Sequence, residues 1–207
     1  MNDKAYWKKY YEENPNPTEP SSFAKFIEGF IEPEKSLIEL GCGNGRDSVF
    51  FAQNHLHVTA IDQVQQEMDY LNSHYSEYNL DFKAEDFTNL ATDQKYDYVY
   101  SRFTLHSINE DAEGRVLKWV SNQLNCDGYF FLEVRSINDP MFNNGEKISE
   151  TENITTHYRR YLDYSKTIEK LENIGLKVIY KIESQGLSVY KDDDPMLIRI
   201  VAQKTEN

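Results

Sequence analysis

Short apolar runs alternate with amphipathic segments along most of the chain. Residues 36–40 and 57–61 are compact apolar runs of the kind that form buried strands, and the segments 46–54 and 65–78 that follow them carry apolar residues at helical spacing. The alternation continues with expected strands at 80–84, 96–100 and 128–134 and expected helices at 110–124 and 165–173. Strands that alternate with helices of this length predict a mainly parallel sheet covered by helices on both faces.

The last part of the sequence breaks this alternation. Two expected strands, 176–182 and 196–202, are joined by a polar segment that contains Pro195 and has no helical periodicity. Strands that are joined without a crossover helix pair antiparallel. The pattern therefore predicts a doubly wound α/β sheet of seven strands, mainly parallel, with an antiparallel last strand.

The first 35 residues predict a helical cap on that sheet. Aromatic residues stand at helical spacing near the start of the chain: Tyr6, Trp7, Tyr10 and Tyr11. The segment Asn14–Pro17 ends this first helix, because proline lacks the N–H donor, and Ser21 or Ser22 can cap a second helix. We expect residues 1–35 to pack on a core formed by residues 36–207, the whole being one structural domain.

Charge and composition restrict the class of function. The chain has 207 residues and a formal net charge of −13, and a surface this acidic repels a nucleic-acid backbone. No apolar run approaches the roughly 20 residues of a membrane span, and the N-terminal segment lacks the apolar centre of a secretory signal. We therefore expect a cytoplasmic protein with a small-molecule partner, no nucleic-acid partner and no membrane span, either a monomer or a homodimer.

The remaining composition argues against metal or disulfide chemistry. Cys42 and Cys126 are far apart in the sequence, so we expect two free thiols. The His, Asp and Glu residues form no compact group with metal-ligand spacing, so no metal site is predicted.

A glycine-rich turn, Glu39-Leu40-Gly41-Cys42-Gly43-Asn44-Gly45, joins the first expected strand to its helix. Glycines allow close approach of the backbone to a nucleotide, and the helix N-terminus offers N–H donors, although the turn by itself also fits a simple tight connection. Its spacing differs from the G-x-G-x-x-G of dinucleotide folds. Asp62 ends the next strand, where a carboxylate can accept both ribose hydroxyls. Asp86 follows the third strand, where it can accept a hydrogen bond from an adenine amino group, with Phe87 beside it.

Taken together, ELGCGNGRDS at 39–48, AID ending at Asp62 and AEDF at 84–87 resemble the class I S-adenosylmethionine-dependent methyltransferases. The resemblance covers residues 36–135 and implies a Rossmann-like fold with S-adenosylmethionine as cofactor. It implies cofactor contacts at Gly41, Gly43, Gly45, Asp62 and Asp86. The full set of predicted cofactor-binding positions is Trp7, Tyr11, Glu39, Gly41, Cys42, Gly43, Arg46, Asp62, Gln63, Asp86, Phe87 and Ser101. The N-terminal aromatic residues either cover the cofactor or form the apolar face of a docked helix. The sequences of the segments YWKKYY and PSSFAKF are similar to those of small methyltransferases encoded in bacterial surface-polysaccharide gene clusters.

Polar residues that follow the fourth and fifth expected strands are candidates for the chemistry, because open α/β sheets bind ligands at the carboxyl ends of their strands. The candidate set is His106, Arg102, Glu133, Arg135, His157, Tyr158 and Arg159. His106 is either a general base, for which a histidine is suited near neutral pH, or a packed histidine that is hydrogen-bonded to the backbone. Glu133 and Arg135 stand two apart on a strand and either face the cleft or pair with each other.

The long polar segment 136–160 is either a lid over the substrate or an ordinary surface excursion. Its arginines next to a histidine and a tyrosine predict an anionic acceptor. The activity expected is therefore O-methylation of an anionic sugar or phosphorylated intermediate in bacterial surface-polysaccharide synthesis.

Three other readings compete with this one. A nicotinamide-dependent reductase is disfavoured by the glycine spacing and by the absence of a Tyr-x-x-x-Lys pair. A nucleic-acid methyltransferase would need a basic face and a motif for a flipped base, and the sequence has neither. A catalytically silent, methyltransferase-like protein that only binds the cofactor stays open.

Overall fold

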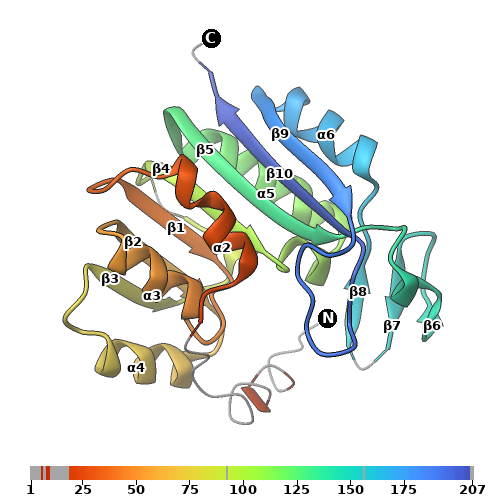
Figure 1. Ribbon diagram of the computed structural model, residues 1–207, viewed down its shortest axis with the longest axis horizontal. Helices are drawn as coiled ribbons and strands as arrows, with labels where there is room; N and C mark the ends of the chain where they lie inside the picture. Colours follow the sequence, from red (N-terminus) through yellow and green to blue (C-terminus); the bar gives the residue numbers. More distant parts are fainter. Residues whose placement is uncertain (1–5, 7, 10–18, 92, 156, 206–207) are drawn as a thin grey trace.

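A computed structural model describes residues 6, 8–9, 19–91, 93–155 and 157–205. Its centre is a seven-stranded sheet in the order β3-β2-β1-β4-β5-β10-β9 (Figure 1). The strands are β1 (Ser36–Leu40), β2 (His57–Asp62), β3 (Leu80–Ala84), β4 (Tyr96–Arg102), β5 (Leu124–Arg135), β9 (Leu176–Ser184) and β10 (Leu197–Lys204). The strands β1 to β5 pair parallel, and β10 lies antiparallel between β5 and β9. The seven-stranded, mainly parallel sheet with an antiparallel last strand is confirmed.

Helices cover both faces of this sheet, so the doubly wound arrangement is confirmed. The helices are α2 (Ser22–Ile27), α3 (Arg46–Gln53), α4 (Gln65–His74), α5 (Glu110–Gln123) and α6 (Tyr164–Asn173). Figure 1 shows α2 in front of the sheet and α5 behind it. Side chains of α2, α3 and α4 pack in one apolar cluster with Phe131 and Tyr100, and those of α5 and α6 pack in a second cluster with Phe130 and Leu132.

The helix predicted after the proline pair begins where the sequence indicates. Ser21 is its N-cap and accepts a hydrogen bond from the backbone N–H of Ala24. Phe23 and Ile27 are fully buried against the sheet, while α2 continues as a single 3₁₀ turn, η1 (Glu28–Phe30). The buried carboxylate of Asp47, in the first turn of α3, accepts from both the N–H and the hydroxyl of Ser21, at 2.7 Å each. This contact fixes α2 against α3.

Two sequence predictions are corrected by the structure. The helix predicted over 65–78 ends at His74, because the backbone of Tyr75, its C-cap, has a φ of −120° and a ψ of 25°, outside helical geometry. The segment 136–160, expected to be irregular, contains a 3₁₀ turn η4 (Pro140–Asn143) and a separate small antiparallel sheet. Its strands are β6 (Glu146–Lys147), β7 (Glu152–Ile154) and β8 (Tyr158–Arg160). Strands of two or three residues are too short to produce a readable alternation.

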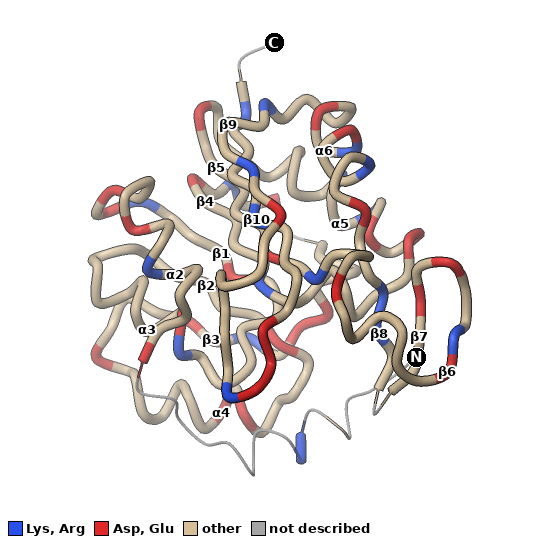
Figure 2. Tube along the Cα trace, turned by 45° about the vertical axis from the view of Figure 1, so that its right-hand side comes forward, with Lys and Arg blue, Asp and Glu red and all other residues tan. Residues whose placement is uncertain are grey.

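The distribution of charge, the length of the helices and the grouping of metal-binding side chains bear on the class of function. Figure 2 shows acidic residues spread around the chain trace instead of gathered on one element. No helix in the described part of the chain is long and apolar enough to cross a membrane. Among the same residues, no group of three or more His, Cys, Asp or Glu side chains is placed to hold a metal ion.

Candidate active site

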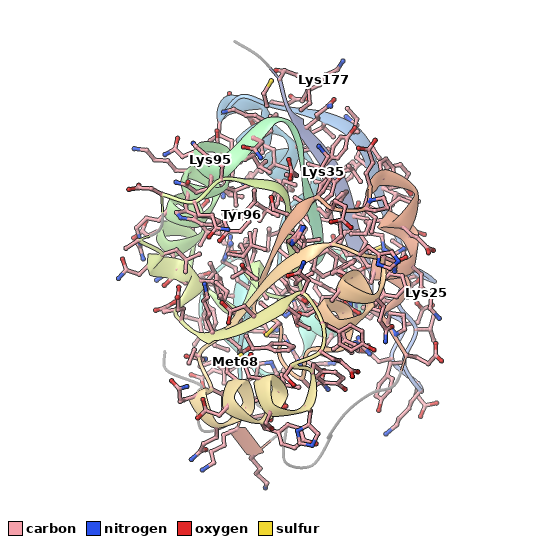
Figure 3. The ribbon with its side chains drawn as sticks, turned by 90° about the vertical axis from the view of Figure 1, so that its left-hand side faces the viewer. Lys25, Lys35, Met68, Lys95, Tyr96 and Lys177 are labelled. Atoms are coloured by element: carbon pink, nitrogen blue, oxygen red, sulfur yellow. The ribbon has the colours of Figure 1, made fainter. Side chains whose placement is uncertain are left out.

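The carboxyl ends of the parallel strands meet at one edge of the sheet, and the glycine turn lies there. In Figure 3, Lys35 and Lys95 mark the amino-terminal edge, and Met68 lies at the opposite end, next to the turn. The N–H groups of Gly41 and Cys42 both donate to the carbonyl of Ile61, at 2.8 and 2.9 Å. The turn is thus tied to the end of β2.

Two glycines of the turn are required both because a Cβ would clash with neighbouring side chains and because their φ angles are positive. Gly41 has a φ of 73°, and a Cβ there would lie 2.4 Å from the methyl group of Thr104. Gly45 has a φ of 76°, and a Cβ there would lie 2.9 Å from the ring of Phe82. Positive φ is costly for any residue with a Cβ. At these two positions, therefore, only a residue without a side chain fits the turn.

Asp62 is placed as the sequence predicts, at the carboxyl end of β2. Its Oδ2 accepts from the backbone N–H of Gly43, at 3.2 Å, and its Oδ1 accepts from that of Val64, at 3.2 Å. Only 8% of the residue is exposed. The next residue, Gln63, is exposed. A carboxylate held by two backbone donors is preorganised to accept hydroxyl groups as well.

Asp86 lies after β3 beside an open cavity. The cavity has a volume of about 450 Å³ and is lined by Glu85, Asp86, Asn89 and Ala91. Asp86 caps the 3₁₀ turn η2 (Phe87–Asn89), and its Oδ1 accepts from the backbone N–H and the hydroxyl of Thr88, at 2.9 and 2.7 Å. The ring of Phe87 would lie 3.9 Å from a Cβ on Gly41. The cavity, Phe87 and the glycine turn are therefore adjacent.

The acidic and basic residues around the turn are mostly engaged with each other. Glu39 is buried and accepts from the hydroxyl of Ser48, and burial followed by the nearby charge of Asp47 raises the pKa of Glu39 well above its usual range. The Nε of Arg46, a predicted cofactor-binding position, lies 3.8 Å from the Oδ1 of Asp47. Asp47 also accepts from the hydroxyl of Tyr100, at 2.8 Å.

Of the remaining predicted cofactor positions, Cys42 and Ser101 are buried, and two others lie outside the described residues. The thiol of Cys42 is buried 3.8 Å from the sulfur of Met68, and burial raises its pKa well above the usual value. Ser101 is fully buried at the end of β4, where its hydroxyl hydrogen-bonds that of Thr104. Trp7 and Tyr11 lie outside the described residues, so their placement stays a prediction.

His106 lies on the 3₁₀ turn η3 (Leu105–Ser107), which follows β4. The residue is 5% exposed, and its Nδ1 is buried without a hydrogen-bond partner among the described residues. Burial lowers the pKa of His106 well below 6.5, and nearby positive charges lower it further, in the order Arg159, Arg135, His157 and Arg102. The ring is therefore neutral near pH 7, and it faces cationic side chains from three strands.

Two of those arginines have their charge balanced within the protein. Arg102, Glu133 and Arg199 are direct neighbours across β4, β5 and β10. Arg102 donates to Glu133 at 3.0 Å, and Arg199 donates to the other oxygen of the same fully buried carboxylate. Glu133 is therefore the centre of an ion cluster. It does not pair with Arg135, which instead donates to Asp139, at 3.0 Å, and to Asp193.

Arg159 differs from these two. Its Nη1 lies 3.1 Å from the sulfur of Met141 and 3.2 Å from the hydroxyl of Thr155, and no carboxylate pairs with it among the residues that the structure describes. Burial, followed by the charge of Arg135, lowers its pKa. His157 is buried, with its ring centroid 4.5 Å from that of Tyr6. The hydroxyl of Tyr158 donates to Glu152 on the neighbouring strand, and burial raises its pKa.

The structure thus brings His106, His157, Arg159, Arg135 and Arg102 to one edge of the sheet and turns the hydroxyl of Tyr158 into the small sheet. Sequence reasoning missed Asp193, which shapes this edge, and it counted Arg160 together with Arg159 toward an anionic acceptor, whereas Arg160 pairs with Glu113. Asp193 stands in the run KDDD, which carries no sign of its partner. Arg160 follows Arg159 directly, and the pair of arginines was the available signal.

Comparisons with known proteins agree with this arrangement. The TehB family, described as tellurite resistance protein TehB, matches residues 1–186. An uncharacterized methyltransferase of Staphylococcus carnosus is 24% identical over 156 residues, which are 72% of this chain and 74% of that protein.

Two solved structures have the same fold. One is 1,6-didemethyltoxoflavin-N1-methyltransferase of Burkholderia thailandensis, solved with 1,6-didemethyltoxoflavin and S-adenosylhomocysteine; its TM-score is 0.74 at 18% identity, over 98% of this chain and 86% of that one. The other is TehB of Haemophilus influenzae, with a TM-score of 0.73 at 16% identity, over 96% of this chain and 67% of that one. The chain therefore belongs to the TehB family of class I S-adenosylmethionine-dependent methyltransferases.

Proposed function

We propose that the protein transfers the methyl group of S-adenosylmethionine to a small anionic acceptor that binds between η3 and β8. The observation that carries the proposal is the buried Nδ1 of His106, which has no hydrogen-bond partner in the described part of the chain and lies among cationic side chains. A buried polar atom without a partner costs about 1–3 kcal/mol. An acceptor that donates a proton to this nitrogen would remove that cost, and an anionic group on it would meet the charge of Arg159.

The residues around the glycine turn fit the cofactor. Side chains are kept out at Gly41 and Gly45, Asp62 is held in place to accept ribose hydroxyls, and the cavity beside Asp86 has room for a base. When bound, S-adenosylmethionine supplies an electrophilic methyl group, so the protein mainly has to orient the acceptor and take its proton.

His106 is assigned the proton and Arg159 the anion. A histidine that is neutral at pH 7 can accept a proton as the acceptor's oxygen attacks, and the surrounding arginines then disfavour retention of that proton on the ring. Arg159 is assigned the anion because Arg102 and Arg135 already have carboxylate partners. His157 also lies near His106, beside the proposed acceptor site.

The acceptor class follows from this charge pattern. An anionic sugar or a phosphorylated intermediate of bacterial surface-polysaccharide synthesis is the acceptor that we propose. The family description names tellurite resistance, and a compact oxyanion is a second candidate that the same arginine would hold. A chain that binds the cofactor without any turnover is the alternative from another class.

Two measurements separate these alternatives. Calorimetry should show S-adenosylmethionine and its demethylated product binding with micromolar-order affinity, about −8 kcal/mol, and NAD binding far more weakly. Methyl transfer should then be followed by mass spectrometry with phosphorylated sugars, their neutral analogues and tellurite as acceptors. Equal affinity for NAD would remove the cofactor assignment. Turnover of a neutral analogue as efficient as that of the phosphorylated sugar would remove the anionic acceptor.

Replacement of Asp62 by alanine should weaken cofactor binding by roughly 1–3 kcal/mol, because the ribose hydroxyls then lose a charged acceptor. Calorimetry on the purified variant measures the change. Asp81→Ala is the matched control, since this exposed carboxylate lies on the edge strand β3 and forms an ion pair with the exposed Lys83 of the same strand. If Asp62→Ala binds as tightly as Asp81→Ala, the ribose lies elsewhere.

Replacement of Arg159 by glutamine should raise the KM of the acceptor by about 10-fold or more, since a hydrogen bond to a charged group is worth about 1.5–3 kcal/mol. The kcat should change much less, because the contact is made before and during methyl transfer. Arg115→Gln removes the same charge from an exposed position on α5 and should leave both constants unchanged. A KM for Arg159→Gln within twofold of the control would argue against this contact.

A further inference from the structure

Arg159 and Arg160 are consecutive on β8, and their side chains leave the strand on opposite sides, as successive residues of a strand do. Arg159 reaches Met141 and Thr155, whereas Arg160 reaches η3. The Nε of Arg160 donates to the carbonyl of Ile108, at 3.0 Å, and its Nη2 lies 3.5 Å from the carbonyl of Leu105. These two carbonyls stand on either side of His106 in the chain.

The charge of Arg160 is satisfied away from the acceptor. Its Nη2 lies 3.2 Å from Glu113 of α5, a carboxylate that is 1% exposed. Lys170 of α6 binds the same carboxylate at 2.7 Å and also binds Glu110 at 2.6 Å. Arg160 is 4% exposed. It is therefore held between two helices and one turn, and its cation is not offered to a ligand.

We propose that Arg160 is a positioning residue, which fixes the turn carrying His106 and couples its place to that of Arg159 on the same strand. A 3₁₀ turn leaves carbonyls without partners in its own backbone, and a guanidinium can donate to two of them from one planar group. Within the described part of the chain, no hydrogen bond to Nδ1 holds the ring of His106, which packs beside the ring of Phe103. The backbone on either side of His106 therefore contributes to the position of the ring.

The proposal rests on the proposed function for the role of His106, but its test needs no acceptor. The position of the ring is reported by its own titration, which depends on burial and on the charged groups that face it: Arg102 from β4, Arg135 from β5, and His157 and Arg159 from the segment of β8. Replacement of Arg160 by lysine keeps a positive charge beside the turn. A change in the titration of His106 in that variant therefore reports a movement of the turn and not the loss of a charge.

The experiment compares Arg160→Gln, Arg160→Lys and Lys170→Met with the wild type, using the whole chain without acceptor. Nuclear magnetic resonance of the histidine rings follows His106 as a function of pH. In Arg160→Gln the pKa of His106 should rise toward its ordinary value, because the released turn lets water reach the ring. Arg160→Lys keeps the charge beside Glu113 but cannot bridge two carbonyls, so it should shift the titration in the same direction and serves if the glutamine variant does not fold.

Lys170→Met is the matched control, since it also removes one cation from Glu113 but leaves both carbonyl contacts intact. It should titrate as the wild type does. With an acceptor in hand, Arg160→Lys should lower kcat by about 10–10²-fold, the usual result of a small misplacement of a reacting group, and leave the KM for the cofactor unchanged.

Two results would overturn the proposal. One is an unchanged titration of His106 in both arginine variants. The other is an equal shift in Lys170→Met, which would assign the effect to the charge around Glu113 instead of the turn. The proposed function fails by a different observation, normal turnover without His106, which leaves the titration result standing.

Discussion

Replacement of His106 by alanine should lower turnover by about 10²–10⁴-fold, the usual contribution of a positioned general base. The affinity for S-adenosylmethionine should stay near the wild-type value, because Asp62 at the end of β2 is held by Gly43 and Val64, whereas His106 follows β4, which β1 separates from β2. Initial rates with a known acceptor, together with calorimetry for the cofactor, measure the two effects. His74→Ala, at an exposed histidine of α4, should be unaffected in both.

The same variant has a pH signature that does not need the acceptor. The folded protein lowers the pKa of His106 below the 6.5 of the unfolded chain, through burial and then through Arg159. The unfolded chain therefore takes up a proton first, and the wild type loses stability as the pH falls through 6.5 toward the lower folded value. His106→Ala should lose less free energy of unfolding between about pH 7.5 and pH 5.5. Equal losses in both proteins would mean that His106 is not buried as described.

Replacement of Glu133 by glutamine should destabilise the protein by about 3–5 kcal/mol, because two buried arginines then lose their shared counter-charge. Arg102 and Arg199 are 15% and 7% exposed at their side chains, so water offers little compensation. The free energy of unfolding from urea denaturation measures the loss. Glu172→Gln, on the exposed side of α6, should change it by less than about 0.5 kcal/mol. A loss below 1 kcal/mol for Glu133→Gln would show that the cluster is solvated.

The periodicity of the sequence predicted the main sheet because its strands are long enough to be read one at a time. The edge where Asp62 and His106 lie also follows, since residues after parallel strands share one end of a sheet. The small sheet at 146–160 could not be predicted in this way, because its pairing depends on contacts between strands of two or three residues.

Which charged residues pair inside the site depends on the register between neighbouring strands, and the sequence of one strand alone does not determine that register. Glu133 and Arg135 stand two apart on β5 and looked like partners for each other, yet Glu133 pairs with Arg199, 66 residues away. That pairing exists because β10 enters the sheet beside β5 with these two residues opposite each other. The roles assigned to the site residues stay predictions until the variants are measured.

The position of β10 determines when the site becomes complete during synthesis. The glycine turn, Asp62 and Asp86 are all translated before β4, and the strands that carry them pair with one another. The proposed acceptor site waits for Asp193 and Arg199, which are translated after β9. Until β10 enters between β5 and β9, β5 is an open edge of the sheet and is exposed to pairing with other chains. A nascent chain can therefore form the proposed cofactor site well before the proposed acceptor site is complete, and aggregation, more than faulty catalysis, is the hazard at that stage.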